Sequence, residues 1–408
     1  MNKKNIPELR FPEFDGEWES KKLGEITIKI GDGLHGTPKY SENTGYYFIN
    51  GNNLIEGKVC IYDNTKEISY NEYNANYKGL TKNTLLISIN GTIGNVAIFN
   101  DETVMLGKSI GYFIFKNDCS FYFHLLKTQT VQKYFISELT GTTIKNLSLK
   151  TLRETKLLVP SFPEQTKIAN FLTTVDKKIT QLKQKKALLE KYKKGMMQKI
   201  FSQEIRFKDE NGEDFAEWKD KRLKEVFSLF NGFAFSSNDS TNEGIRWIKI
   251  ADVGIQTMRR DNLSYLPKYY VNKYNKFILK KGDYVIALTR PILNDKLKIA
   301  LIDDFFNNSL LNQRVGKLVS KKNKTFIYHM LQQKWLIKSI ENNIMGTDPP
   351  NLSPKEIGYI KVEVPKIEEQ TKIANFLTKL DDKINTVDSQ IKKTELWKKG
   401  LLQRMFCG

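Results

Sequence analysis

The sequence predicts an α+β protein in which two mixed α/β modules are joined by a long antiparallel two-helix coiled coil with pseudo-twofold symmetry. Two observations lead to this prediction. A long stretch of the chain occurs twice, and each copy has the heptad pattern of a coiled-coil helix. The segments outside these copies contain short β-type runs separated by Gly and Asn, which is typical of strand-rich domains.

The repeat is the decapeptide EQTKIANFLT, which occurs unchanged at residues 164–173 and 369–378. The match extends upstream without a gap to Asn-Leu-Ser, at 146–148 and 351–353. Ten identical residues in register within a longer alignment indicate an internal duplication.

A second shared block opens each half of the chain, as ELRF at 8–11 and EIRF at 204–207. Between these openings and the shared ends, residues 28–140 and 228–345 show little similarity to each other. The sequence therefore predicts two connectors that stayed alike and two modules that diverged.

Each connector is predicted to be a helix of about 40 residues, about 60 Å long at 1.5 Å per residue. Ser161 and Glu164 would form a capping box at the start of the first helix. Apolar residues follow a four-three alternation, broken by a few polar positions such as Lys193 and Lys398. The seam residues expected to make the helix–helix contact are Ile168, Leu172, Ile179, Ile373, Leu377 and Ile384.

A narrow apolar seam needs a partner, and the other copy in the same chain is the nearest one. The first helix leads into the second module and the second helix leaves it, so the pair should run antiparallel, with the modules at opposite ends. A coiled coil that serves only oligomerisation is the alternative. The predicted domains are the first module at 1–160, the first connector helix at 161–203, the second module at 204–364 and the second connector helix at 365–408.

Local patterns predict elements inside both modules. Asn90-Gly91 is a turn signal between two β-type runs, and helical stretches come late in each module. The strands are expected at 85–89, 95–99, 246–250 and 283–288, and the helices at 121–138 and 326–341.

Charge and hydropathy limit the function. With 65 Lys and Arg against 46 Asp and Glu, the net charge of +19 points to a polyanion, either nucleic acid or an acidic membrane surface. The first residues lack the apolar region of a signal peptide, and no apolar run is long enough to span a membrane. We therefore expect a cytoplasmic protein without a membrane segment.

The sequence contains no recognisable reaction centre. Neither a GxGxxG cofactor loop nor a GxxxxGKS/T phosphate loop is present. Asp348-Pro349-Pro350-Asn351 resembles the Asp-Pro-Pro-aromatic motif of adenine methyltransferases, but Asn replaces the aromatic residue, which favours a Pro-rich turn. Three dispersed Cys and three dispersed His predict neither a disulfide framework nor a metal site.

Side chains suited to nucleic acid are well represented. A glycine-punctuated loop can approach a phosphate closely, Asn is suited to adenine, and Arg is suited to guanine. For any single residue a solvated surface side chain is the simpler interpretation, but the set on a +19 chain favours nucleic acid. The candidates are His35, Thr37, Lys39, Tyr40, Asn50 and Asn52 in the first module, and Arg246, Lys249, Arg259, Arg260, Arg290 and Arg314 in the second.

The repeated EQTKIANFLT with its heptad helix, the preceding Asn-Leu-Ser and the two divergent modules resemble the specificity (S) subunit of type I restriction-modification enzymes. The resemblance covers essentially the whole chain. The segments DGLHGTPKY at 32–40, IALTRP at 286–291 and LNQRVG at 311–316 are similar to parts of the target recognition domains of that family.

The resemblance implies that each module is a target recognition domain that reads one half of a split, asymmetric site in double-stranded DNA. The helices would set the spacer and bind two modification (methyltransferase) subunits, which restriction subunits would join. This chain would be non-catalytic and without a cofactor, while S-adenosylmethionine, ATP and Mg would belong to the partners. A stand-alone coiled-coil nucleic-acid-binding protein and a nuclease acting alone remain the alternatives.

Overall fold

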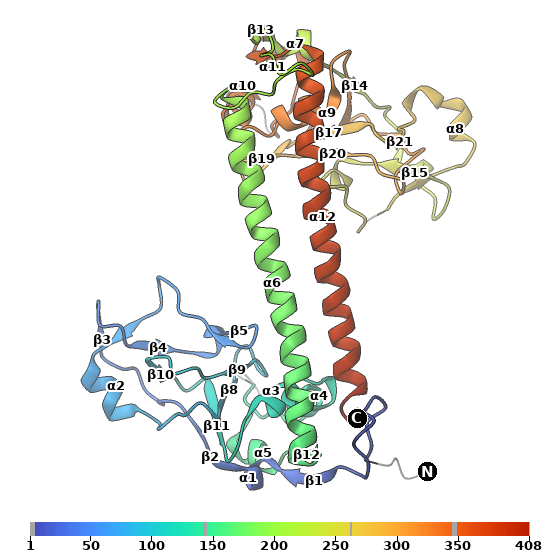
Figure 1. Cartoon of the computed structure of the whole chain (residues 1–408). Helices are drawn as coiled ribbons and strands as arrows, with labels where there is room; N and C mark the ends of the chain where they lie inside the picture. Colours follow the sequence, from blue (N-terminus) through green and yellow to red (C-terminus); the bar gives the residue numbers. More distant parts are fainter. Residues whose placement is uncertain (1–4, 142–144, 262, 345–348, 408) are drawn as a thin grey trace. The chain divides into compact units, whose positions relative to one another are not determined.

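The computed structural model describes residues 5–141, 145–261, 263–344 and 349–407 (Figure 1). No helix within this described part of the chain is long and apolar enough to cross a membrane. The chain divides into two compact units, each of which contains parts of both long helices. The first unit is formed by residues 1–184 with 388–408, and the second by residues 185–387.

Two long helices correspond to the predicted connectors, α6 at Phe162–Phe201 and α12 at Ile367–Arg404. In the first unit, Leu401 near the end of α12 belongs to the same apolar core as Ile168 near the start of α6. In the second unit, Ile200 at the end of α6 shares a core with Ile373 at the start of α12. The two helices therefore run antiparallel within each unit, as Figure 1 shows for α6 in green and α12 in red.

The predicted seam is largely the buried face of these helices. Five of its six residues are buried, whereas Ile384 is only partly buried. Lys193, which looked like an interruption of the seam, is also buried, with 7% of its surface exposed. The five buried seam residues are Ile168, Leu172, Ile179, Ile373 and Leu377.

The module of the first unit is built on an antiparallel sheet of order β2-β11-β8-β9 and a smaller sheet of order β10-β4-β7-β3, in which β10 and β4 are parallel. β1 pairs with β12 beside the start of α6. The elements are β1 Glu19–Lys22, α1 Leu23–Ile26, β2 Thr27–Asp32, β3 Tyr40–Ser41, β4 Tyr47–Ile49, η1 Gly51–Asn53, β5 Leu54–Ile55, β6 Lys58–Val59, β7 Glu67–Ile68, α2 Tyr70–Asn76, β8 Thr84–Ser88, β9 Val96–Ile98, β10 Val104–Leu106, β11 Ile110–Phe115, α3 Ser120–Leu126, α4 Gln129–Ser137, α5 Leu149–Glu154 and β12 Lys156–Val159.

The module of the second unit has an antiparallel sheet of order β14-β22-β17-β20 and a smaller sheet of order β16-β15-β21, in which β15 and β21 are parallel. The elements are β13 Lys219–Arg222, α7 Leu223–Val226, β14 Ser228–Asn231, η2 Ser237–Asp239, β15 Ile245–Ile248, η3 Ile250–Asp252, β16 Tyr265–Leu266, α8 Tyr270–Lys273, η4 Asn275–Phe277, β17 Tyr284–Ala287, β18 Ile292–Leu293, β19 Lys296–Leu297, β20 Ile299–Leu301, β21 Leu310–Leu311, β22 Val315–Val319, α9 Lys324–Met330, α10 Lys334–Ile344, α11 Pro354–Ile357 and β23 Lys361–Val364.

The two modules share one topology, although their sequences show little similarity. In the first module Gly111 of β11 pairs with Asp32 on one side and with Ile87 on the other. In the second module Gly316 of β22 pairs with Asn231 and Ile286 in the same way. Sequence divergence therefore left the register of the central strands unchanged, because a sheet core requires apolar residues of fitting volume and not particular ones.

The predicted strands are present within two residues of their expected ends, but each predicted late helix is two helices. The stretch 121–138 is divided into α3 and α4, and 326–341 into α9 and α10. Between α3 and α4 the backbone of Thr128 is extended, and its hydroxyl donates to Leu125 O at 2.7 Å. This short-range hydrogen bond competes with continuation of the helix.

An aromatic cluster joins each module to the helices of its own unit. In the first unit, the rings of Trp18 and Phe121 lie 6.2 and 5.5 Å from that of Phe406, which follows α12. In the second unit, Trp218 and Phe326 lie 6.3 and 5.5 Å from Phe201 at the end of α6. These rings extend the module core to the helix ends.

Candidate nucleic-acid interface

The loop after β2 presents the first group of candidate residues to solvent. His35 and the side chains at 37 and 39 are exposed, and His35 Nε2 lies 2.7 Å from Asp32 Oδ2. Tyr40 in β3 is 49% exposed, with its ring 6.3 Å from that of Phe48. The structure thus places His35, Thr37, Lys39 and Tyr40 on one exposed segment.

The two asparagines near η1 differ in their surroundings. Asn50 is half-buried, and its Oδ1 accepts a hydrogen bond from Ser109 Oγ at 2.8 Å. Ser109 Oγ in turn accepts the Gly51 N–H at 2.8 Å. Asn50 therefore has a structural role, whereas Asn52 is exposed.

Two of the predicted arginines of the second module are held by other protein groups. Arg246 donates to Phe305 O, and its guanidinium lies 3.7 Å from the centre of the Phe305 ring. Arg260 lies 4.5 Å from the same ring and forms an ion pair with Asp303 at 2.6 Å. Lys249 Nζ lies 4.1 Å from the Trp247 ring. These contacts orient the cations, and the hydrogen bonds of Arg246 and Arg260 also occupy part of their donor capacity.

The remaining arginines of the candidate set, Arg259, Arg290 and Arg314, are exposed. Arg290 has a φ of 46°, and its N–H donates to Pro350 O at 2.8 Å. Asn351 Oδ1 accepts from Thr289 Oγ1 at 2.7 Å. Residues 349–351 therefore line the end of β17 as a Pro-rich turn, while Asp348 of the predicted motif lies outside the described residues.

An Arg–Glu pair fastens the opening block of each half to a helix start. In the first unit, Arg10 Nε and Nη2 donate to Glu164 Oε1 and Oε2 at 2.8 and 2.7 Å. Glu164 is 1% exposed. The capping box predicted for Ser161 and Glu164 is not formed among the described residues, where the Glu164 carboxylate accepts from Arg10 and not from Ser161.

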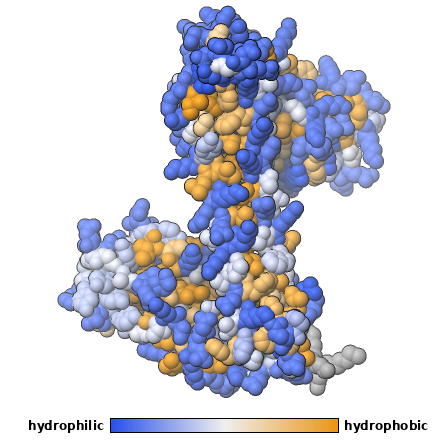
Figure 2. Space-filling model, in the orientation of Figure 1, coloured by the Kyte–Doolittle hydropathy of each residue, from blue (hydrophilic) through white to orange (hydrophobic). Residues whose placement is uncertain are grey.

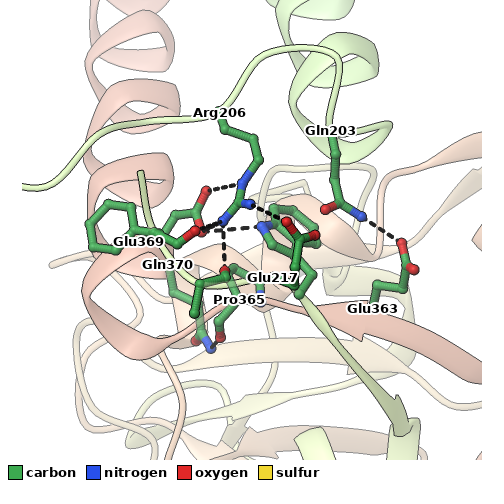
Figure 3. Close-up of polar contacts among 10 residues, drawn as sticks. Gln203, Arg206, Glu217, Glu363, Pro365, Glu369 and Gln370 are labelled. Atoms are coloured by element: carbon green, nitrogen blue, oxygen red, sulfur yellow. Dashed lines mark hydrogen bonds and ion pairs between the residues drawn. The ribbon is translucent and has the colours of Figure 1, made fainter. Parts of the chain in front are cut away.

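The second unit repeats this arrangement, as Figure 3 shows. Arg206 Nε and Nη2 donate to Glu369 at 3.2 and 2.9 Å, and Arg206 also donates to the carbonyls of Phe215 and Ala216. Trp218 Nε1 adds a third donor to the buried Glu369 carboxylate at 3.2 Å. A bidentate pair of this kind, with its carboxylate buried, is strongly directional and holds the opening block in one orientation.

A buried histidine, an aspartate and a lysine also meet in each unit. In the first unit, His124 of α3 lies 4.0 Å from Asp176 of α6, and Asp176 accepts from Lys398 of α12. In the second, His329 of α9 lies 3.9 Å from Asp381 of α12, which accepts from Lys193 of α6 at 2.5 Å. Both lysines are seam positions.

Burial, together with a smaller effect of the neighbouring lysine cations, lowers the pKa of His124 and of His329 to about 3. Both rings are therefore neutral at neutral pH. They contribute apolar packing and cannot act as general acids there.

The described residues contain no group of three or more His, Cys, Asp or Glu side chains placed to hold a metal ion. What both units do offer is a strand-rich module with exposed polar loops, fixed to a pair of long helices. Such an arrangement can bind and position a ligand.

The family model that matches this chain is that of the type I restriction modification DNA specificity domain, and it matches twice, at residues 15–191 and 216–395. Together the two matches cover most of the chain. The chain belongs to this family. It is a type I specificity subunit with two target recognition domains, and such subunits are the non-catalytic DNA-recognition components of their systems.

Individual relatives agree with this assignment. The MjaVIII specificity subunit of Methanocaldococcus jannaschii is 29% identical over 421 residues, which cover 100% of this chain and 95% of that protein. The EcoAI specificity subunit of Escherichia coli is 29% identical over 172 residues, 41% of this chain and 28% of that protein. The S subunit of M. genitalium has the same fold, with a TM-score of 0.62 at 20% identity over 98% of this chain and 99% of that one.

Figure 2 shows hydrophilic residues over much of the visible face of both units, with apolar residues along part of the long helices. Large apolar side chains are indeed exposed on these helices. They include Leu188 and Tyr192 on α6 and Leu396 and Trp397 on α12, each at least 51% exposed. In a specificity subunit, exposed apolar positions on the connectors are candidates for contact with other subunits.

Proposed function

We propose that each target recognition domain reads one half of a bipartite, asymmetric site in double-stranded DNA, while the two long helices set the spacer between the half-sites. The observation that carries this proposal is the pair of modules with one topology and different exposed polar residues. One backbone frame that presents two sets of side chains is suited to two different half-sites.

Fixed attachment of each module to its helices supports the spacer role. Glu164 is joined to Arg10 by two hydrogen bonds, and Glu369 to Arg206 in the same way. The aromatic clusters around Phe406 and Phe201 add apolar contact. With the modules held in this way, the length of the helices would determine how far apart the half-sites lie on DNA.

Recognition would combine two kinds of contact. Lys and Arg on the exposed loops would contact phosphates and supply salt-dependent affinity, and polar side chains at base edges would supply discrimination. Residues 1–160 and 204–364 would be the recognition domains, and residues 161–203 and 365–408 the connectors.

The exposed apolar side chains of the helices support contact with other proteins. We propose that two methyltransferase subunits bind there, and that restriction subunits join the resulting complex. S-adenosylmethionine, ATP and Mg would be bound by those partners. A solved structure described as concerning complex assembly of a type I restriction-modification system has the same fold, with a TM-score of 0.54 at 14% identity.

The test is deletion of about four residues, roughly one turn, from corresponding exposed positions of both helices, followed by methylome sequencing of cells that carry the complete system. The expected result is a changed spacer between two unchanged half-sites. A methylated site with an unaltered spacer would contradict the spacer role. Purification of the chain without any methyltransferase subunit from the same cells would instead favour a stand-alone nucleic-acid-binding protein.

A further inference from the structure

A turn between two strands is anchored by backbone hydrogen bonds on several sides in the first recognition domain. This turn, residues 107–109, connects β10 to β11 beside the loop that follows β2. The Gly107 N–H donates to Ile49 O at 2.8 Å, and the Leu34 N–H donates to Leu106 O at 2.8 Å. Ser109 O accepts the Ile89 N–H at 2.9 Å.

The second recognition domain repeats this pattern around residues 312–314, between β21 and β22. The hydrogen bonds that correspond to those of the first domain are Asn312 N–H to Ile248 O at 3.2 Å, Phe233 N–H to Leu311 O at 2.9 Å, and Leu288 N–H to Arg314 O at 2.9 Å. We name residues 107–109 and 312–314 the anchored turns.

A glycine stands at the same place in both domains, and its surroundings show that the two backbones follow the same course there. A Cβ atom on Gly33 would lie 2.2 Å from Leu106 O, and one on Gly232 would lie 2.1 Å from Leu311 O. Neither position can accept a side chain without movement of the backbone. The loop after β2 or β14 therefore approaches the anchored turn equally closely in both domains.

The hydrogen bonds give a residue-by-residue correspondence between the two anchored turns. Lys108 corresponds to Gln313, and Ser109 corresponds to Arg314. Lys108, Gln313 and Arg314 are exposed, and within the described part of the chain their own side chains form no hydrogen bond or ion pair. The backbone N–H of Arg314 donates to Asn312 Oδ1 at 3.0 Å, which further fixes the turn. A rigid backbone thus presents different, unengaged polar side chains at one corresponding place.

The side chains at neighbouring positions, in contrast, are engaged by other protein groups. Ser109 Oγ is engaged by Asn50 and Gly51, as described above, and so it supports the turn. Lys249, which corresponds to Asn50, has its ammonium over the Trp247 ring. The side chains of residues 108, 313 and 314 therefore have no role in holding the fold together.

We infer that the anchored turns are corresponding specificity-determining elements, with Lys108 contacting bases of one half-site and Gln313 and Arg314 contacting bases of the other. This inference rests on the proposed function, the reading of one half-site by each domain. Arg and Lys are suited to the O6 and N7 acceptors of guanine, and Gln is suited to the N6 and N7 pair of adenine. A rigid frame favours base reading, because discrimination needs donors held in one geometry.

The test exchanges the corresponding residues in the complete complex. Lys108→Gln and Gln313→Lys are made separately, and base preference is measured by selection from a library in which both half-sites are randomised. Each variant should change the preferred base at one or two positions of one half-site only, with a discrimination change of at least about 5-fold. Lys150→Gln, which removes the same charge from an exposed position on α5, is the matched control and should leave both half-sites unchanged.

A third variant separates base contact from phosphate contact. Arg314→Lys keeps the positive charge but removes the planar fork that binds guanine through two donors. A changed base preference in one half-site supports the inference. Unchanged half-sites in all three variants, or an equal loss of affinity on unrelated DNA, would overturn it while the proposed function stands. A wild-type complex that selects no bipartite site would overturn both.

Discussion

Lys193 on α6 donates to Asp381 on α12 at 2.5 Å. The lysine that interrupts the apolar seam therefore makes a specific contact between the two helices. The Lys193 side chain is 9% exposed and that of Asp381 is 31% exposed. A second pair, Lys398 with Asp176, stands at the corresponding place in the first unit. Because a buried charge requires a partner, these pairs disfavour other registers of the two helices.

Removal of one charge from this pair should destabilise the second unit. Asp381→Asn leaves the Lys193 ammonium buried without a counter-charge, and we expect a loss of up to about 3 kcal/mol, reduced by the partial exposure of the carboxylate. The double variant Asp381→Asn with Lys193→Met should recover much of this loss. The measurement is a double-mutant cycle on the thermal unfolding midpoint, and equal midpoints for wild type and Asp381→Asn would show that the pair is not stabilising.

The two buried histidines should make stability depend on pH. Their pKa values are lowered from 6.5 to about 3, so the unfolded chain binds more protons than the folded protein between these values. Their contribution is therefore fully present above pH 6.5 and decreases as the pH falls through this range, by about 1.4 kcal/mol per pH unit for each histidine.

His124→Gln combined with His329→Gln removes both imidazoles while leaving the other titrating groups in place. Thermal unfolding midpoints measured between pH 7 and pH 4 should decline less steeply for this double variant than for the wild type. Parallel declines for the two proteins would mean that the histidines can be protonated in the folded state.

Single loop cations should affect only one half-site. Lys39 lies on the exposed loop of the first recognition domain and Arg290 on an exposed turn of the second. Lys39→Ala should weaken binding to DNA with an intact first half-site, and Arg290→Ala should act only through the second. The affinity of each variant complex is measured by titration with DNA in which one half-site at a time is scrambled. An equal loss of affinity on unrelated sequences would identify a backbone phosphate contact.

Much of the architecture could be predicted from the sequence because its signals are periodic or repeated. The duplication, the two long helices and most of their seam are local patterns, and Ile168 and Ile373 are buried as the heptad predicts. The basic composition and the absence of cofactor motifs pointed to recognition without catalysis. These properties do not depend on which distant residues meet.

The specific contacts inside each unit were decided by the tertiary structure. Arg10 and Glu164 are each part of a visible repeat, yet nothing in either segment indicates that they bind each other. Similarly, Lys193 and Asp381 become partners only when two helices from distant parts of the chain align. The shared topology of the modules was also hidden, because strand pairing between residues such as Gly111 and Asp32 is set by backbone hydrogen bonds and apolar volume, which many different sequences satisfy.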